Sequence, residues 1–251
     1  MKGDQTLLEA IKKYDEVDSW KTVIFLYNSA LKEVGTKLEI LNDEFQHVHQ
    51  YNPIEHIKTR IKTPESIVKK LKRYGYETSI DNMIKYINDV AGVRLICSFT
   101  SDIYRLAEMI GNQSDLKVLS IKDYIRNPKD SGYKSYHMLV SVPIFLSDNV
   151  VDTKVEIQFR TIAMDFWASL EHKIYYKFEG NAPDYISHDL RECAQMVSEL
   201  DEKMLSLNEA IQECLKNGTC GVASQQRADA ITTHVIDSDR SQPKLHLNDK
   251  K

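Results

Sequence analysis

The sequence predicts an α+β fold, in which one mixed β-sheet is flanked by helices and long helices stand at both ends of the chain. Apolar residues recur at helical spacing over about 18–50 and again over about 184–215, and strand-like runs lie between these regions. The later strand-like runs follow one another with loops only. Because parallel neighbours require long crossover connections, this order favours a mixed sheet over a purely parallel one.

The first long helix is expected to end before Pro53, since a residue that precedes proline disfavours helical geometry. The next helix has a clear start, with Thr63 as N-cap and Pro64 at the first helical position. It stops near Gly75, a residue suited to a helix C-terminus. The remaining elements are expected in the order helix 81–88, strand 91–99, helix 102–110, strands 116–121, 135–144 and 153–160, and helices 162–177 and 184–215.

Residues 1–217 are predicted to form a single domain, with a core at about 50–180 and terminal helices available for packing on a partner. The chain is polar and aperiodic after Gly218, so 218–251 is interpreted as a disordered tail. The first sixteen residues are charged throughout, and no apolar run approaches the ~18 residues of a membrane span. The four cysteines show no metal-type spacing. We therefore expect a cytoplasmic protein with reduced thiols and no membrane partner.

The net charge of −4 predicts no general attraction to nucleic acid. Against this average, seven Lys and Arg residues and one acid lie between His56 and Arg73. Arg60 and Lys62 precede a predicted helix N-terminus, whose free N–H groups favour phosphate, and Ser66 offers a hydroxyl in its first turn. Lys70 and Arg73 continue the same side of that helix. An ordinary solvated basic helix is the alternative for this segment.

Apolar and polar residues alternate strictly through 155–160, which predicts a half-buried strand with Glu156 and Gln158 on its polar face. Asp89 precedes another predicted strand. Carboxylates are the ligands that Mg²⁺ commonly takes from proteins, the rest being phosphate and water. Each acid alone has a structural interpretation, because Asp89 could end a helix and Glu156 could pair with a cation across strands. Together among many cations, they indicate a magnesium site for phosphate chemistry.

Two further groups suit a nucleotide. The guanidinium of Arg94 can stack on a base as well as bind phosphate. In the basic loop 129–137, Gly132 permits a tight turn and Tyr133 offers a ring for stacking. Lys134 adds charge there, and His137 is expected on the strand face beside the site. A lone tyrosine after glycine is weak support, and it counts only because basic residues flank it.

Together these segments resemble the synthetase domain of RelA/SpoT-type enzymes, and the overall length resembles the stand-alone small alarmone synthetases. The resemblance covers roughly residues 20–210, and Trp167–Lys177 is similar to the RelP-like branch, which is not strongly activated by its own product. The matching segments are 56–62, Asp89-Val90-Ala91-Gly92-Val93-Arg94, 123–125 with Pro128-Lys129, 131–137, Val155-Glu156-Ile157-Gln158-Phe159-Arg160-Thr161 and 164–172.

The resemblance implies a nucleotidyltransferase-like synthetase fold, a homotetramer and a role in the stringent response. It implies Mg²⁺-dependent transfer of the β,γ-pyrophosphate of ATP to the 3′-hydroxyl of GDP or GTP, giving AMP and ppGpp or pppGpp. It assigns adenine to Arg60 and Arg94; the ATP phosphates to Lys62, Ser66, Lys70 and Arg73; metal binding and catalysis to Asp89 and Glu156; and the guanosine nucleotide to Tyr133, Lys134, His137 and Gln158.

Three alternatives stay open. Basic helices with tyrosines also suit single-stranded RNA, although the negative net charge opposes this. A nucleotidyltransferase that moves AMP is expected to show Gly-Ser followed by paired acids, which the sequence lacks. A guanine-nucleotide sensor without catalysis would not need both carboxylates. Only His188-Asp189 matches the hydrolase motif of the long RelA/SpoT enzymes, so we expect no alarmone hydrolysis.

Overall fold

The computed structural model describes residues 2–11, 16–49, 51–177 and 183–217. Two compact units are present, residues 1–202 and residues 203–251, and the described part of the second is the C-terminal end of one long helix. The elements are α1 (Lys2–Ile11), α2 (Glu16–Val48), β1 (Ile54–Ile61), α3 (Pro64–Arg73), α4 (Ile80–Tyr86), β2 (Ala91–Cys97), α5 (Thr100–Gly111), β3 (Lys117–Asp123), β4 (Tyr136–Phe145), β5 (Val150–Thr161), α6 (Ile162–Lys177) and α7 (Asp184–Asn217). The predicted tail, 218–251, lies outside the described residues.

The five strands form one sheet in the order β1-β2-β5-β4-β3. Strands β2 and β5 are parallel, and the other neighbouring pairs are antiparallel. The predicted mixed sheet is therefore confirmed. The last strand of the chain, β5, lies in the centre of the sheet, and its apolar residues Val155, Ile157 and Phe159 are completely buried.

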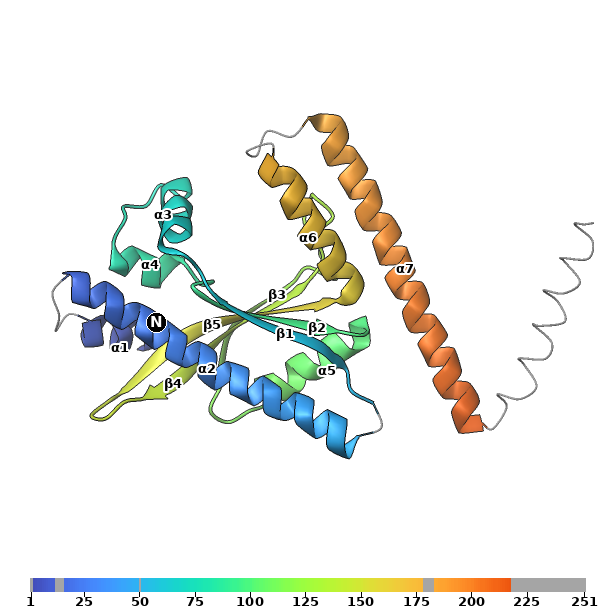
Figure 1. The fold of residues 1–251 in the computed structure, drawn as a ribbon, viewed down its shortest axis with the longest axis horizontal. Coiled ribbons are helices and arrows are strands. Elements are labelled where there is room, and N and C mark those ends of the chain that lie inside the picture. Colours follow the sequence, from blue (N-terminus) through green and yellow to red (C-terminus); the bar gives the residue numbers. More distant parts are fainter. Residues whose placement is uncertain (1, 12–15, 50, 178–182, 218–251) are drawn as a thin grey trace, which may run out of the picture. The chain divides into compact units, whose positions relative to one another are not determined.

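The helices cover both sides of this sheet. Figure 1 shows α3 and α6 on one side, and α2 and α5 on the other. Helix α2 contacts β1, β2, β4 and β5, and it buries Val23, Tyr27, Val34 and Leu38 in the main core. The predicted helical periodicity of this segment is thereby confirmed. Because α2 packs on one side of the sheet, the polar residues of β5 face the other side.

The predicted start of α3 is correct in detail. The hydroxyl of Thr63 accepts a hydrogen bond from the Ser66 N–H, and Pro64 occupies the first helical position. Gly75 has a φ of 75°, the left-handed conformation expected just after a helix. This capping fixes the N-terminus of α3, which follows β1, and thereby the position of the basic side chains on the helix.

Two elements were not predicted, α1 and β1. Strand β1 is an edge strand in which Ile54 is the one fully buried residue, so its sequence lacks the alternation that signals a strand. Helix α1 is short and charged, and buries Leu7 and Ile11. Neither segment contains enough apolar residues for a periodic pattern to be recognised.

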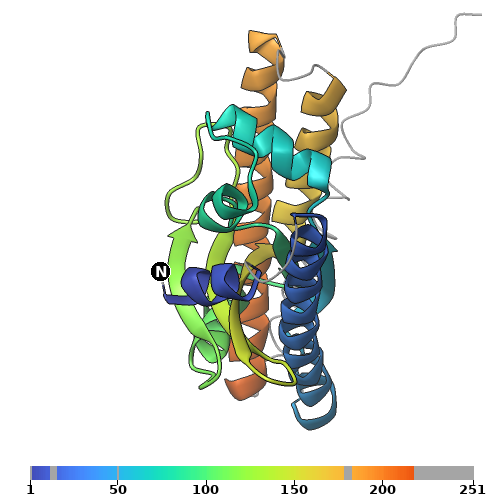
Figure 2. The same ribbon diagram turned by 90° about the vertical axis from the view of Figure 1, so that its left-hand side faces the viewer.

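Lys154 is buried, although the alternation of β5 placed it on the polar face with Glu156. Its ammonium donates to the backbone carbonyl of Ile84 at 2.6 Å and pairs with Asp4 at 2.8 Å. Helices α1 and α4 therefore meet over this end of β5 (Figure 2). Among the described residues, no helix combines the length and the apolar character needed to cross a membrane.

Candidate active site

A cleft of about 880 Å³ lies over the polar face of the sheet, between residues of α3 and residues of α6. All the predicted site residues except Lys134 line it: Arg60, Lys62, Ser66, Lys70, Arg73, Asp89, Arg94, Tyr133, His137, Glu156 and Gln158. Segments that lie far apart in sequence thus share one cavity. Residues not assigned beforehand also line the cleft, namely Tyr74, Lys122, Tyr124, Lys129, Ser131, Arg160, Ala168, Ser169, Glu171, His172 and Lys173.

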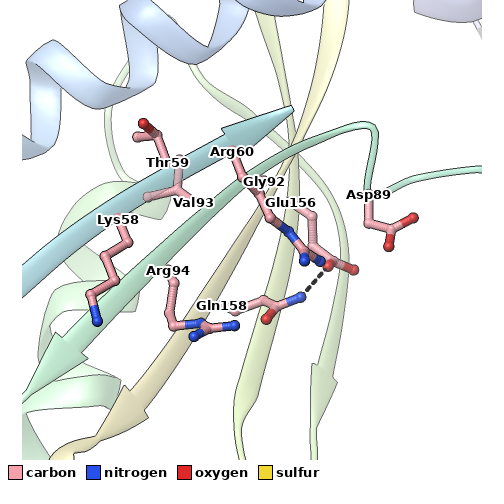
Figure 3. Close-up of a pocket in the computed structure, with 9 residues that line it drawn as sticks. All are labelled: Lys58, Thr59, Arg60, Asp89, Gly92, Val93, Arg94, Glu156 and Gln158. Carbon is pink, nitrogen blue, oxygen red and sulfur yellow. Dashed lines mark hydrogen bonds between the residues drawn. The ribbon is translucent and has the colours of Figure 1, made fainter. Parts of the chain in front are cut away.

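Strand register explains why these side chains converge. Gly92 pairs with Glu156 and Arg94 with Gln158 across the parallel strands, while Arg60 lies opposite Gly92 on β1. Residues two apart on a strand face the same side. A Cβ at Gly92 would lie 3.8 Å from the Arg60 side chain. That distance is an ordinary van der Waals contact, and Arg60 extends over the sheet past Gly92 toward Glu156 (Figure 3).

Asp89 lies in the turn before β2, as its place before a predicted strand indicated, and Glu156 lies on the neighbouring strand β5. The two oxygens of Asp89 accept from Lys62 at 2.7 Å and Lys70 at 2.8 Å. Burial alone raises the pKa of Asp89, but the bonds and charges of the two lysines outweigh it and lower the pKa to about 2. The two lysines that are predicted to bind phosphate therefore both contact this carboxylate.

The low pKa of Asp89 predicts a pH-dependent contribution to stability. The unfolded carboxyl titrates near 3.8 and the folded one near 2, so the fold favours the ionised form. This contribution, about 2 kcal/mol, is complete above pH ~4 and disappears as the pH falls through the folded pKa. In urea titrations, Asp89→Asn should lose stability at pH 6, and the deficit should shrink by pH 3. The exposed Asp81→Asn is the control for removal of a surface carboxylate, and a constant deficit for Asp89→Asn would contradict the prediction.

Glu156 is the second carboxylate of the cleft. It accepts from Gln158 Nε2 at 2.6 Å and lies 3.5 Å from His137 Nδ1. Burial raises the pKa of Glu156, but His137 and Gln158 bring it below the ordinary value, while the charge of Asp89 opposes them. Both carboxylates are thus ionised near neutral pH and face the same cleft. Two anionic oxygen donors open to phosphate fit the ligand preference of Mg²⁺.

The guanine side of the prediction centres on Tyr133. Its hydroxyl lies 3.0 Å from His137 Nε2, and its ring meets the His137 and Tyr124 rings edge to face. The ammonium of Lys129 lies 4.7 Å from the Tyr133 ring centroid. A ring fixed at its hydroxyl end and flanked by a cation offers a stacking surface for a base.

Lys134 points elsewhere. Its ammonium donates to the hydroxyl of Ser198 on α7, and it lines a separate small cavity together with Trp167 and Asp201. Its role with the guanosine nucleotide therefore stays a prediction. In the same loop, Gly132 has a φ of 86° and packs directly against Ala194 of α7. The loop that carries Tyr133 is thus anchored on α7.

Two residues to which sequence reasoning gave no role are linked by an ion pair in the cleft region, Arg160 and Asp165. Arg160 shares the alternation of Glu156 and Gln158, and this signal could have identified it; its side chain is only 7% exposed. Asp165 contacts both Arg160 and Arg94 from the first turn of α6. No local pattern marks it, because its partners lie on two strands.

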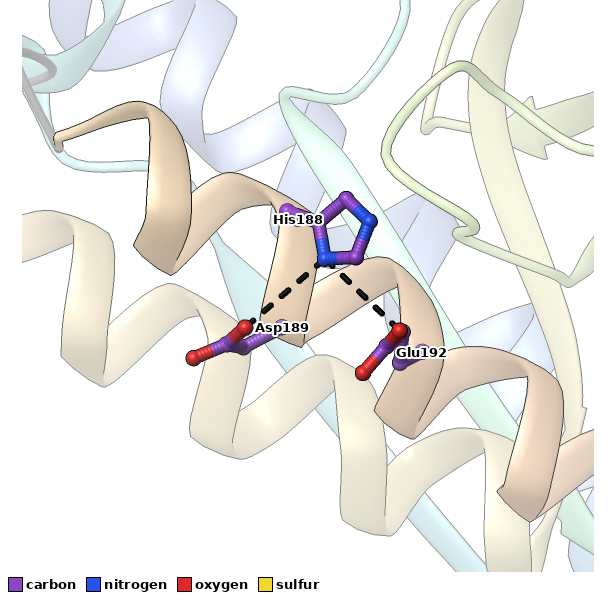
Figure 4. Close-up of side chains that lie close together, drawn as sticks. All are labelled: His188, Asp189 and Glu192. Carbon is purple, nitrogen blue, oxygen red and sulfur yellow. Dashed lines mark ion pairs between the residues drawn. The ribbon is translucent and has the colours of Figure 1, made fainter.

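The pair His188-Asp189, which matches the hydrolase motif, has a third polar neighbour, Glu192, that the sequence analysis did not identify. His188 Nδ1 lies 3.8 Å from Asp189 and 3.7 Å from Glu192, one turn later on α7 (Figure 4). All three side chains are more than 60% exposed. Exposed acids beside a histidine are ordinary on a helix surface, and the absence of hydrolysis stays a prediction.

A mixed sheet with a cleft that places two carboxylates among many cations is typical of the class of enzymes that act on nucleotide phosphates. Residues 59–181 match the family described as the region found in RelA/SpoT proteins. The chain is 46% identical to the GTP pyrophosphokinase YwaC of Bacillus subtilis (strain 168) over 195 residues, which are 78% of this chain and 93% of the relative.

Solved structures agree. The crystal structure of small alarmone synthetase 2 from Bacillus subtilis has a TM-score of 0.70 and 45% identity, over 76% of this chain and 98% of that one. Small alarmone synthetase 1 from the same organism, bound to its product pppGpp, has a TM-score of 0.72 and 34% identity, over 77% and 98%. The chain therefore belongs to the RelA/SpoT family, among its small alarmone synthetases. The expected family and fold are both confirmed.

Proposed function

We propose that this protein synthesises alarmones by transferring the β,γ-pyrophosphate of ATP to the ribose 3′-hydroxyl of GDP or GTP. The observation that carries the proposal is the single cleft, in which two ionised carboxylates lie between a basic helix terminus and a tyrosine-bearing loop. Small alarmone synthetase 1, with its product pppGpp, supports the same reaction class. Synthesis of ppGpp or pppGpp as a signal suits an enzyme of the stringent response.

On the ATP side, Arg60 and Arg94 come from β1 and β2 and face the same part of the cleft (Figure 3). Planar guanidinium groups there can hold adenine between them. Lys62, Ser66, Lys70 and Arg73 would bind the phosphates. When ATP enters, its phosphates replace Asp89 as the partners of Lys62 and Lys70, because they carry more negative charge than one carboxylate.

On the guanosine side, Tyr133 stacks on the base, while His137, Gln158 and Lys134 orient the nucleotide. The 3′-hydroxyl oxygen attacks the β-phosphorus of ATP, and the bond from that phosphorus to the α,β-bridging oxygen breaks. AMP leaves with this oxygen. Glu156, which lies beside His137 and Gln158, accepts the hydroxyl proton. Positioning and charge neutralisation carry most of such a reaction.

Asp89 and Glu156 would hold Mg²⁺, since both are ionised and offer free oxygen lone pairs to the cleft. When bound, the ion neutralises charge on the phosphate chain and its leaving group. We further infer a cytoplasmic location, where the four cysteines would be reduced thiols. From the family resemblance we infer a homotetramer, and light scattering of the purified protein measures this oligomeric state.

The test is a radiolabel transfer. The protein is incubated with Mg²⁺, GDP and γ-³²P-labelled ATP, and the nucleotides are separated by thin-layer chromatography. Label is expected in a guanosine tetraphosphate, with one AMP released for each. Label released as free pyrophosphate, which transfer of AMP would give, or no labelled guanosine product with either GDP or GTP, would overturn the proposal. Omission of Mg²⁺ with a chelator is expected to abolish the labelled product.

A further inference from the structure

The cleft holds three guanidinium groups close to one another. Burial and the charges of Arg160 and Arg60 lower the pKa of Arg94, whereas Asp165 acts in the opposite direction. One oxygen of Asp165 contacts both Arg160 Nη1 at 2.9 Å and Arg94 Nη1 at 3.1 Å. Asp165 is only 15% exposed. A single carboxylate thus lies between two neighbouring cations and offsets part of their mutual repulsion.

From Arg160 the contacts continue to the opposite side of the cleft. Its Nη2 donates to the Tyr133 hydroxyl at 2.9 Å and to Gln158 Oε1 at 3.3 Å. The guanidinium also lies 5.3 Å from the Tyr133 ring centroid. Because Arg160 is almost fully buried and salt-bridged to Asp165, it is a rigid donor for these groups.

These contacts favour one arrangement of protons around His137. A guanidinium only donates, so the Tyr133 oxygen accepts from Arg160, and its own O–H is available to donate to His137 Nε2. With that donation, a neutral His137 carries its proton on Nδ1, which faces Glu156. The contacts therefore run without interruption from Asp165, through Arg160, Tyr133 and His137, to the carboxylate beside the reacting hydroxyl.

We propose that Asp165 and Arg160 are positioning residues that couple the two nucleotide subsites. Asp165 orients Arg94 directly on the adenine side and, through Arg160, the Tyr133 ring on the guanine side. This inference rests on the proposed function, which supplies the two nucleotides. Neither residue needs to touch a nucleotide. Loss of either residue would misalign the side chains of the ATP subsite and of the guanosine nucleotide subsite together.

An ordinary structural role makes a different prediction. Asp165 is an acid in the first turn of α6, where a negative charge stabilises the helix by itself. Asp81 is a matched control, because it is an exposed acid in the first turn of α4 and does not line the cleft. If Asp165 acted only on its helix, Asp165→Asn and Asp81→Asn would both lower thermal stability and leave nucleotide binding intact.

The experiment compares Asp165→Asn, Tyr133→Phe and Asp81→Asn by KM for ATP, KM for GDP, kcat and thermal denaturation. Asp165→Asn should raise both KM values about tenfold, because breaking a buried charge pair releases both partners. Tyr133→Phe keeps the ring but loses the bond to Arg160, so it should raise only the KM for GDP. Asp81→Asn should lower the thermal stability slightly and leave kcat and both KM values at the wild-type level. A change in one KM alone for Asp165→Asn, or in neither, overturns the coupling.

A cycle of Tyr133→Phe with Arg160→Lys gives an independent test if Asp165→Asn does not fold. Lysine keeps the charge but cannot reach Asp165 and Tyr133 with a planar fork. The double variant should raise the KM for GDP no more than Arg160→Lys alone, and multiplying effects overturn the proposal.

Equilibrium binding separates this inference from the proposed function. Affinities for α,β-methylene ATP and for GDP are measured with each nucleotide alone. An inactive wild type that binds both nucleotides, with Asp165→Asn weakening both, would refute the transfer reaction and support the coupling. An active wild type with unchanged affinities in Asp165→Asn would do the reverse. A wild type that binds neither nucleotide refutes both.

Discussion

Glu156→Gln is expected to lower kcat about a thousandfold or more while the affinities for ATP and GDP change less than about threefold. The amide has the shape of the carboxylate and can still accept the 2.6 Å bond from Gln158 Nε2. It carries no charge, cannot accept the 3′-hydroxyl proton and is a poor ligand for Mg²⁺. The loss should therefore fall on the chemical step rather than on nucleotide binding.

Single-turnover transfer of labelled pyrophosphate measures that step, and fluorescence titration with each nucleotide measures binding. Glu108→Gln on the exposed face of α5 is the matched control, because it makes the same chemical change on a helix that does not line the cleft. Equal losses in binding and turnover for Glu156→Gln would mean that Glu156 supports the fold of the cleft instead.

Gly132→Ala is the second substitution with a large expected effect. A Cβ at Gly132 would lie 2.5 Å from the Ala194 Cβ, closer than real carbon atoms approach, and the φ of 86° is unfavourable for alanine. Backbone strain of ~1 kcal/mol and overpacking of ~1–3 kcal/mol both oppose the native loop. The loop carrying Tyr133 should shift away from α7, and the KM for GDP should rise about tenfold while that for ATP changes little.

The double variant Gly132→Ala/Ala194→Gly separates the two causes. It removes the overlap and keeps the unfavourable φ, so it should recover part of the GDP affinity and of the free energy of unfolding. Gly111→Ala is the control, since its new Cβ would meet Val118 and Met138 at ordinary distances of 3.6 and 3.8 Å. A KM for GDP that is unchanged in Gly132→Ala would show that the loop does not depend on this contact.

The sequence was most informative where local chemistry acts alone. Thr63 and Pro64 correctly predicted the start of α3, and the alternation through 155–160 correctly predicted the central strand. Edge strand β1 was missed because it buries too little to need an apolar pattern. The predicted site residues lie in one cleft apart from Lys134, and their individual roles are predictions that the experiments above address.

What sequence could not provide is pairing across elements. The charge of Lys154 indicates a solvated position, yet α1 and α4 cover it and supply Asp4 and the Ile84 carbonyl. Asp165 likewise looks like any acid in a first turn. Such roles depend on which strands lie side by side, and this register is a property of the whole sheet rather than of any short segment.

The position of β5 has a consequence for biosynthesis. A ribosome releases β1 and β2 first and β3 and β4 next, each pair able to form its own antiparallel ladder. These two ladders stay separate sheets with open inner edges until residues 150–161 emerge and join them. Translation that stops before β5 would therefore leave two partial sheets with unpaired edges, which are prone to aggregate or to bind chaperones. The strand that completes the sheet also carries Glu156, so a nascent chain gains the carboxylate proposed for catalysis only when the sheet is complete.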